Sequence, residues 1–159
     1  MSPLHDLPGH LIRRLHQIAV SAFMSEVSAV GSDLTPVQFA ALATLRDNPG
    51  LDQATLAGLI AYDRVTIGGV VSRLEKRGLL VRTTSDQDRR SRSLKLTTQG
   101  AALLDDLEGA VLRAQDLMLG GLTPGEKAIF MELLRKSADA GNTISRAPLK
   151  TASAYLEDR

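Results

Sequence analysis

One segment, residues 62–97, constrains the fold of this chain more than any other. Near its start is Asp63, a residue type that caps helix N-termini, and further along is Gly78, a residue type that ends helices in the left-handed conformation. Two short runs with strand character follow, 79–84 and 92–96, and the residues between them are rich in arginine. The order of helix, glycine, strand, basic turn and strand predicts a winged helix-turn-helix, whose last helix fits a DNA groove.

Positive charge is concentrated in the same segment. Residues 61–97 contain nine Lys or Arg and four Asp or Glu, a net charge of +5, whereas the whole chain carries +1 and the remainder therefore −4. A basic segment in a near-neutral chain is typical of a protein that contacts nucleic acid through one surface. A DNA-packaging protein without sequence preference would instead be basic throughout.

Composition excludes several other classes of protein. Aromatic residues make up only 3% of the chain, which argues against single-strand binders that stack bases on aromatic side chains. The absence of cysteine excludes disulfides and thiolate metal sites, and no enzyme motif is present. Because we find no signal peptide and no apolar run of roughly 18 residues, we expect a cytoplasmic protein that does not enter a membrane.

Helical periodicity extends over most of the remaining chain. The spacing of apolar residues and the helix-starting and helix-ending residues predict helices over about 7–30, 35–47, 52–61, 98–119 and 123–140. We therefore expect one domain over 1–159, mainly α with a small β-hairpin wing. Within it we expect a winged helix-turn-helix lobe (34–97), a helical dimerisation region (7–30 and 98–140) and a flexible tail (142–159). The terminal helices have more apolar face than so small a lobe can cover, which predicts a homodimer.

Two motifs carry a resemblance to a known family. Asp88-Arg89-Arg90 is followed after five residues by Leu96-Thr97, and the helix starting at Asp63 opens with Asp-Arg-x-Thr. In both respects the chain resembles the MarR family of winged helix-turn-helix transcription regulators, and the resemblance extends over about 7–140. It implies a homodimer that binds a pseudo-palindromic operator, and usually repression that a small phenolic or aromatic acid relieves.

The helix over 63–77 is expected to enter the major groove. Arg64 can donate two hydrogen bonds to a guanine, and Thr66 can contact a base edge or a thymine methyl group. Ile67 is in phase with the apolar face, so we expect it to be buried. Gly68 and Gly69 weaken the helix and suggest a close backbone approach, either to a phosphate or to another helix.

The predicted wing supplies the other DNA contacts. The resemblance implies that Asp88 and Arg90 form an ion pair that shapes the wing, which leaves Arg89 and Arg92 to reach the minor groove or phosphates. Arg73 lies either on a solvated helix face or against a phosphate. The complete predicted DNA-binding set is Arg64, Thr66, Arg73, Arg89, Arg90 and Arg92.

The first helix contains a candidate ligand site. Arg13, Arg14 and His16 border its apolar arc, where a guanidinium could bind a carboxylate and an imidazole a ring hydroxyl. The segment also resembles the branch of the family that controls breakdown of aromatic carboxylates, in which an arginine of this helix anchors the ligand, and Arg13 is the preferred match. Alternatively, these arginines form ion pairs between subunits.

No metal or cofactor is expected, because the three histidines are not spaced on one helical face. The expected partners are double-stranded operator DNA, a second copy of the chain and a small aromatic carboxylate or phenolic effector. Two alternatives stay open: a response to other lipophilic or phenolic compounds, and DNA binding without a small-molecule effector.

Overall fold

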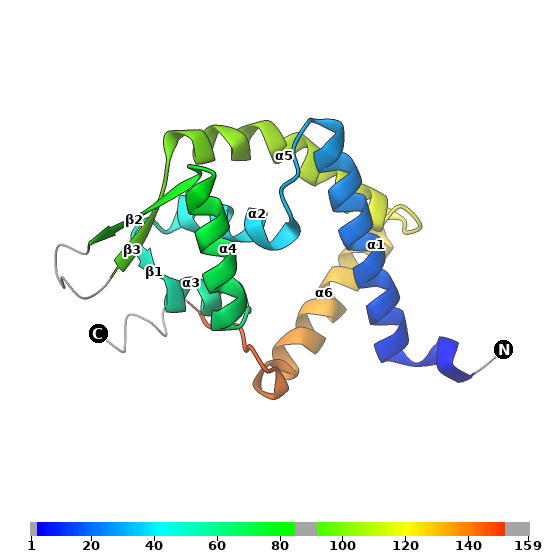
Figure 1. The fold of residues 1–159 in the computed structure, drawn as a ribbon. Helices are drawn as coiled ribbons and strands as arrows, with labels where there is room; N and C mark the ends of the chain where they lie inside the picture. The colour runs from blue at the N-terminus through cyan, green and yellow to red at the C-terminus, as the bar shows by residue number, and fades with distance from the viewer. Residues whose placement is uncertain (1–2, 85–91, 152–159) are drawn as a thin grey trace. The chain divides into compact units, whose positions relative to one another are not determined.

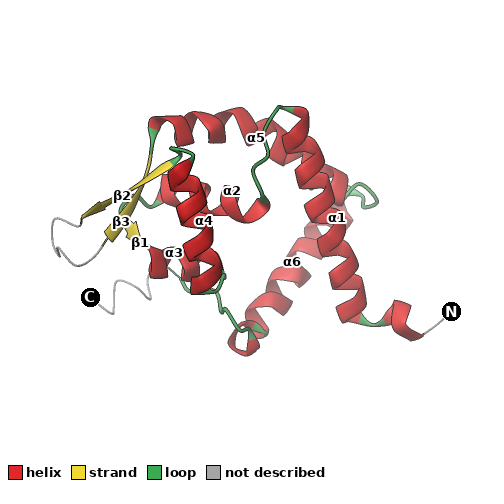
Figure 2. Cartoon of the chain, viewed as in Figure 1, coloured by secondary structure: helices red, strands yellow, loops and turns green. Residues whose placement is uncertain are grey.

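The computed structural model describes residues 3–84 and 92–151. In chain order the elements are a 3-10 turn (Pro3–Asp6), α1 (Pro8–Ala29), α2 (Pro36–Asp47), β1 (Leu51–Asp52), α3 (Gln53–Leu59), α4 (Arg64–Lys76), β2 (Leu80–Thr84), β3 (Arg92–Leu96), α5 (Thr98–Met118), α6 (Pro124–Ala140) and a second 3-10 turn (Asn142–Ile144) (Figures 1 and 2). The chain divides into two compact units, residues 1–36 with 106–132, and residues 37–105 with 133–159.

The first unit contains α1 and most of α5. Its buried side chains include Phe23 and Val27 of α1 and Leu107, Ala110 and Ala114 of α5. Arg113 Nε donates to Glu26 Oε2 at 2.7 Å, which joins the two helices by an ion pair.

The start of α6 also belongs to the first unit, and the sequence Thr123-Pro124-Gly125-Glu126 predicts a capping box there. Thr123 N donates to Glu126 Oε2 at 2.8 Å, while Glu126 N donates back to Thr123 Oγ1 at 3.4 Å. This exchange is a capping box, as the Thr-Pro-Gly-Glu sequence predicts. The hydrogen bonds from the main chain and the hydroxyl of Thr123 hold the pKa of the Glu126 carboxyl below its ordinary value.

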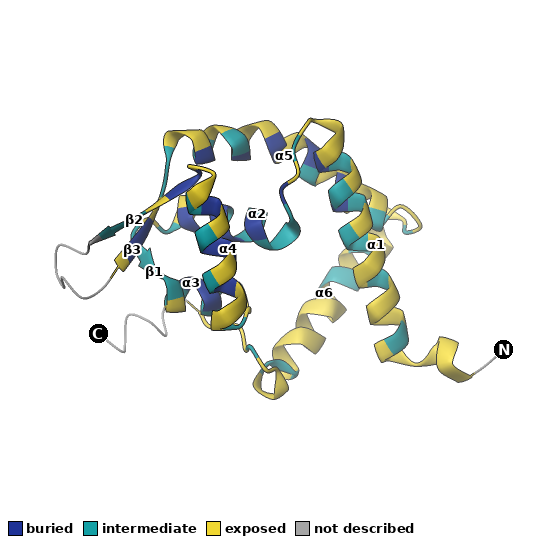
Figure 3. Ribbon diagram, viewed as in Figure 1, coloured by how far each residue is buried: buried dark blue, intermediate teal, exposed yellow. Residues whose placement is uncertain are grey.

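The second unit is the winged helix-turn-helix. Leu42, Leu45, Leu56, Leu74 and Leu94 are completely or almost completely buried in it (Figure 3). They come from α2, α3, α4 and β3, so the three helices and the sheet share one core. The sheet has three antiparallel strands in the order β1-β3-β2, because β1, which lies between α2 and α3 in the chain, pairs with β3.

The third strand corrects the prediction of a two-stranded hairpin. Leu51 of β1 pairs with Leu94, and Arg82 of β2 pairs with Leu94 from the other side. A two-residue strand is too short to show any period in a sequence, and only its pairing with β3 defines it.

The sequence of β3 predicts that Leu94 and Leu96 point to one face of the sheet and Ser93 and Lys95 to the other, and this alternation is only partly present. Ser93 is buried like Leu94, and its hydroxyl lies 2.7 Å from the hydroxyl of Thr83 on β2, so the buried polar group has a hydrogen-bond partner. Lys95 is exposed, as predicted.

The turn after α4 depends on one glycine. Gly78 has a φ of +70°, which is the left-handed conformation expected for it. Its carbonyl accepts a hydrogen bond from the hydroxyl of Thr97 at 2.7 Å, and the same hydroxyl accepts from Gly100 N at 3.0 Å. One threonine therefore fixes both the end of α4 and the first turn of α5.

No single helix in the described parts of the chain is long and apolar enough to cross a membrane. The helices α3 and α4 reach that length and composition only when counted together across a bend of 112°.

Candidate functional site

The first turn of α4 is built by its cap. Asp63 Oδ1 accepts from Thr66 N at 2.9 Å, and Asp63 Oδ2 accepts from the Thr66 hydroxyl at 2.7 Å. These two hydrogen bonds, helped by the positive charge of Arg146, hold the pKa of the Asp63 carboxyl below its ordinary value. The Thr66 hydroxyl donates to Asp63, so it is left to act toward a base as an acceptor or through its methyl group.

The two faces of α4 differ sharply. Ile67, Val70, Val71 and Leu74 are buried, and the prediction that Ile67 belongs to the core is confirmed. On the other side Arg64 and Thr66 are exposed near the N-terminus of the helix, at the end that a recognition helix presents to base edges.

Val65 was missed by the sequence analysis. This side chain is 87% exposed, although its neighbour Ile67 is completely buried. An apolar side chain held in water on the same turn as Arg64 is suited to contact a thymine methyl group in the major groove. The signal was available, because Val65 is out of phase with the buried positions of the helix.

The two glycines of α4 have different surroundings. A methyl group at Gly68 would lie 3.3 Å from Gln53 Nε2 of α3, so this glycine allows a close approach of another helix. At Gly69 the nearest group is the guanidinium of Arg73 on the same helix, also at 3.3 Å. Gly69 is exposed, and its carbonyl accepts a hydrogen bond from Arg73 of the same helix.

Two arginines of this segment are engaged within the protein. Arg73 Nε donates to the carbonyl of Gly69 at 3.1 Å, so this side chain is folded along its own helix. Arg82 of β2 forms an ion pair with Glu75, and its second terminal nitrogen donates to the Ser72 hydroxyl at 3.2 Å. Arg82 therefore ties the wing to α4.

The wing is described only in part. Arg92 at the start of β3 is exposed, in keeping with the predicted contact to the minor groove or phosphates. Arg89 and Arg90, together with the predicted Asp88–Arg90 ion pair, lie outside the described residues.

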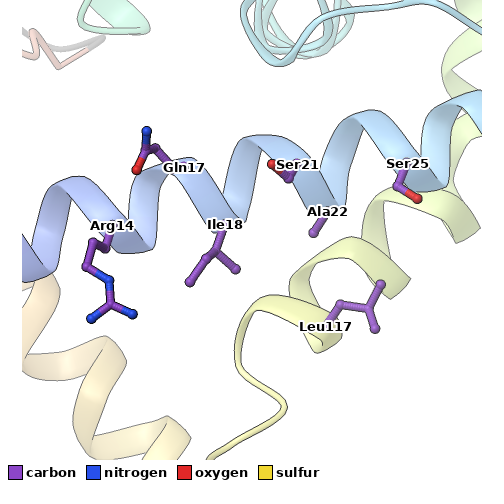
Figure 4. Close-up of a pocket in the computed structure, with 7 residues that line it drawn as sticks. All are labelled: Arg14, Gln17, Ile18, Ser21, Ala22, Ser25 and Leu117. Carbon is purple, nitrogen blue, oxygen red and sulfur yellow. The ribbon is translucent and has the colours of Figure 1, made fainter.

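A pocket of about 520 Å³ lies along α1 in the first unit (Figure 4). It is lined by Arg14, Gln17, Ile18, Ser21, Ala22, Ser25 and Leu117. Arg14 and Ile18 point to the same side of α1, and Leu117 of α5 faces that side (Figure 4). One guanidinium beside aliphatic side chains and two hydroxyls is a chemical environment suited to a small aromatic acid.

The three predicted ligand residues are distributed around α1. Arg14 lines the pocket. Arg13 Nη1 donates to Gln17 Oε1 at 2.8 Å and is not part of the pocket lining. His16 is exposed and does not line the pocket either.

Two histidines contact each other elsewhere in this unit. The rings of His5 and His10 meet edge to face, with centroids 5.4 Å apart. In the described parts of the chain, no group of three or more His, Asp or Glu residues is arranged to hold a metal ion.

Comparison with known proteins matches this chain to a family of transcription regulators. Residues 34–91 match the MarR family. The HTH-type transcriptional repressor NicR of Pseudomonas putida is 37% identical over 146 residues, which are 87% of this chain and 91% of NicR.

Solved structures agree in fold and in sequence. The PcaV transcriptional regulator of Streptomyces coelicolor, in complex with its natural ligand, is 38% identical with a TM-score of 0.78, over 87% of this chain and 96% of PcaV. BpsR of Bordetella bronchiseptica, whose DNA binding is regulated by 6-hydroxynicotinic acid, is 34% identical with a TM-score of 0.78, over 84% of this chain and 94% of BpsR.

Proposed function

Because this chain belongs to the MarR family of DNA-binding transcription regulators, we propose that it is a homodimeric repressor released from its operator by a small hydroxylated aromatic carboxylic acid. The observation that carries the proposal is the Arg14 pocket on α1, in a protein that also has an exposed, capped recognition helix. We propose that it acts in the cytoplasm and catalyses no reaction.

The DNA-binding half of the proposal rests on α4. Asp63 fixes the first turn, and Arg64, Val65 and Thr66 stand exposed on it. The guanidinium of Arg64 can make a bidentate contact with guanine, and the side chain of Val65 offers apolar surface to a thymine methyl group. A twofold dimer presents two such turns to successive major grooves, so the expected operator is an inverted repeat with half-sites about one DNA turn apart.

The apolar surface of the terminal helices supports the proposal that the protein is a homodimer. On α1, Leu11, Ile12 and Ile18 are 47%, 60% and 48% exposed, and on α6 Ile129 and Leu133 are 59% and 55% exposed. Figure 3 shows most of α6 in the colour of exposed residues. Apolar surface of this extent is stable in water when a partner covers it.

The effector half of the proposal rests on the contents of the pocket. The Arg14 guanidinium can bind a carboxylate, while Ile18, Ala22 and Leu117 can contact an aromatic ring. The hydroxyls of Ser21 and Ser25 are available to a ring hydroxyl group. The relatives support this chemistry, because 6-hydroxynicotinic acid, which regulates DNA binding by BpsR, combines a carboxylate with a hydroxylated aromatic ring.

The effector would act by selecting one arrangement of the dimer. The operator requires the two copies of α4 to be held at a fixed separation. A ligand that binds more tightly to a dimer with a different separation weakens DNA binding. The loss in DNA-binding free energy cannot exceed the difference between the ligand's binding free energies for the two arrangements.

The test is fluorescence anisotropy on a labelled fragment from upstream of the gene, with effectors titrated into the preformed complex. We expect a hydroxybenzoate or 6-hydroxynicotinate to release the DNA, and the corresponding uncharged amide, which keeps the ring and the hydroxyl, to leave the complex intact. Equal release by acid and amide would contradict the role of Arg14. Tight, sequence-specific binding with no release by any acid would contradict the effector half and leave the DNA-binding half standing.

A further inference from the structure

The segment after α6 is held against the helix-turn-helix. Lys150 N donates to the carbonyl of Gly58 at the end of α3, at 2.9 Å. The segment is also closed on itself, because Asn142 Nδ2 donates to Leu149 O at 2.9 Å and Leu149 N donates to Asn142 Oδ1 at 2.7 Å. Figure 1 shows this stretch passing beside α3 and the N-terminal end of α4. These three hydrogen bonds hold residues 142–150 as a strap, the name used for them below.

The strap brings basic residues to the start of the recognition helix. It forms a hollow with that helix, lined by Ala54, Ala57, Gly58, Tyr62, Asp63, Arg64, Arg146, Ala147, Pro148 and Lys150. Arg146 and Arg64 are both exposed and line the same hollow, although they are far apart in the sequence. All of these residues belong to the second unit, so their placement depends on that unit alone.

Arg146 also reduces the electrostatic repulsion between the Asp63 carboxylate and DNA phosphates. Asp63 caps α4 at the end that approaches DNA, where a carboxylate repels phosphate. The charge of Arg146 acts on this carboxylate and contributes to its lowered pKa, after the two hydrogen bonds from Thr66. A cation at this position offsets the charge of Asp63 toward an approaching phosphate, so that the cap can be kept without weakening DNA binding.

We propose that the strap is part of the DNA interface, in which Arg146 contacts a phosphate next to the bases that α4 reads. This inference rests on the proposed DNA-binding function and adds a contact outside the helix-turn-helix and the wing. It concerns the phosphate backbone, so Arg146 raises affinity for every DNA sequence and leaves the preference for the operator unchanged.

The experiment measures the salt dependence of binding for operator and random duplexes by anisotropy. The variants are Arg146→Ala, Asn142→Ala and, as a control with the same change in charge, Arg135→Ala on the exposed surface of α6. One phosphate contact per subunit contributes about 0.9 to the slope of log K against log salt, so Arg146→Ala should reduce the slope by about 1.8 per dimer. Arg135→Ala should not reduce it.

Asn142→Ala tests the strap itself. It removes both hydrogen bonds to Leu149 without changing the charge. We expect a reduced salt slope in this variant, which would show that the strap positions Arg146. Thermal unfolding of each variant separates this effect from a loss of stability, which lowers Tm but leaves the slope of the folded protein unchanged.

Three results would overturn the inference. A slope for Arg146→Ala equal to that of Arg135→Ala means that Arg146 contacts no phosphate. A rise in affinity after either strap substitution means that the strap shields α4. A changed operator preference in Arg146→Ala means base contact. If the wild-type protein shows no salt-dependent DNA binding, the proposed function itself fails, which is a different result from any of these.

Discussion

The first turn of α4 and the pocket face of α1 each carry an arginine that we propose for recognition, of DNA and of the effector respectively, but their geometry has different origins. Arg64 directly follows the capping residue Asp63, whose hydrogen bonds to Thr66 span only three positions. By contrast, α1 begins after Leu7, which makes no side-chain cap. The pocket beside Arg14 is completed by Leu117, which lies more than 100 residues later in the chain. Local chemistry therefore organises the DNA-reading turn, whereas tertiary contacts organise the pocket.

The largest expected effect tests the DNA-reading turn. Arg64→Ala should remove a bidentate base contact from each half-site, which costs about 1–3 kcal/mol per copy and reduces the preference for operator over random DNA. Arg73→Ala is the matched control, because that guanidinium is bonded to its own helix. Competition anisotropy with operator and random duplexes measures both variants. An unchanged operator preference in Arg64→Ala would mean that α4 does not dock in this way.

The corresponding change in the pocket should affect the effector and spare the DNA. Arg14→Ala removes a charged hydrogen bond of about 1.5–3 kcal/mol, so effector affinity should fall roughly 10- to 100-fold while operator affinity stays close to wild type. Arg13→Ala should have a much smaller effect, because Arg13 does not line the pocket and reaches it only through its hydrogen bond to Gln17. Isothermal titration with the effector measures both, and the reverse order of effects would assign the anchor to Arg13.

A smaller effect is expected for Arg82, an arginine of the basic segment that stabilises the fold. Arg82→Met keeps the aliphatic length and removes the contacts to Glu75 and Ser72, which are only partly exposed. We expect a loss of about 1–2 kcal/mol in the free energy of unfolding, measured by urea denaturation. The salt slope of DNA binding should not change; a reduced slope would place Arg82 on DNA.

The smallest effect concerns pH. The pKa of Asp63 is lowered in the folded protein, so its carboxylate stabilises the fold above the unfolded-state pKa near 4, and this contribution is lost as the pH falls through the folded-state pKa. Asp63→Asn keeps a capping oxygen but removes the charge. Its deficit in stability relative to wild type should therefore shrink between pH 6 and pH 3, measured by urea unfolding, with Asp139→Asn on α6 as the control. A deficit independent of pH would mean that the charge of Asp63 does not matter.

Charge counting from the sequence needs a correction that these contacts explain. The net charge of +5 over residues 61–97 correctly pointed to nucleic acid, but it counts every cation equally. Arg82 is bound to Glu75 and Arg73 to the carbonyl of Gly69, so neither is simply a charge facing solvent. Arg146, which does share a hollow with Arg64, lies far outside the segment that was counted.

The sequence by itself determined the parts of this protein that depend on neighbouring residues. The cap at Asp63, the left-handed Gly78, the capping box at Thr123 and the burial of Ile67 could all be predicted, because capping bonds and helical period act over three or four positions. The resemblance to the family also followed from short motifs, those that begin at Asp63 and at Asp88. Other features were decided only by the tertiary structure: the strand at Leu51, the choice of Arg14 for the pocket lining, and the approach of Arg146 to the start of α4. Each of these joins residues more than 40 positions apart, and no local pattern records which distant segments a folded chain brings together.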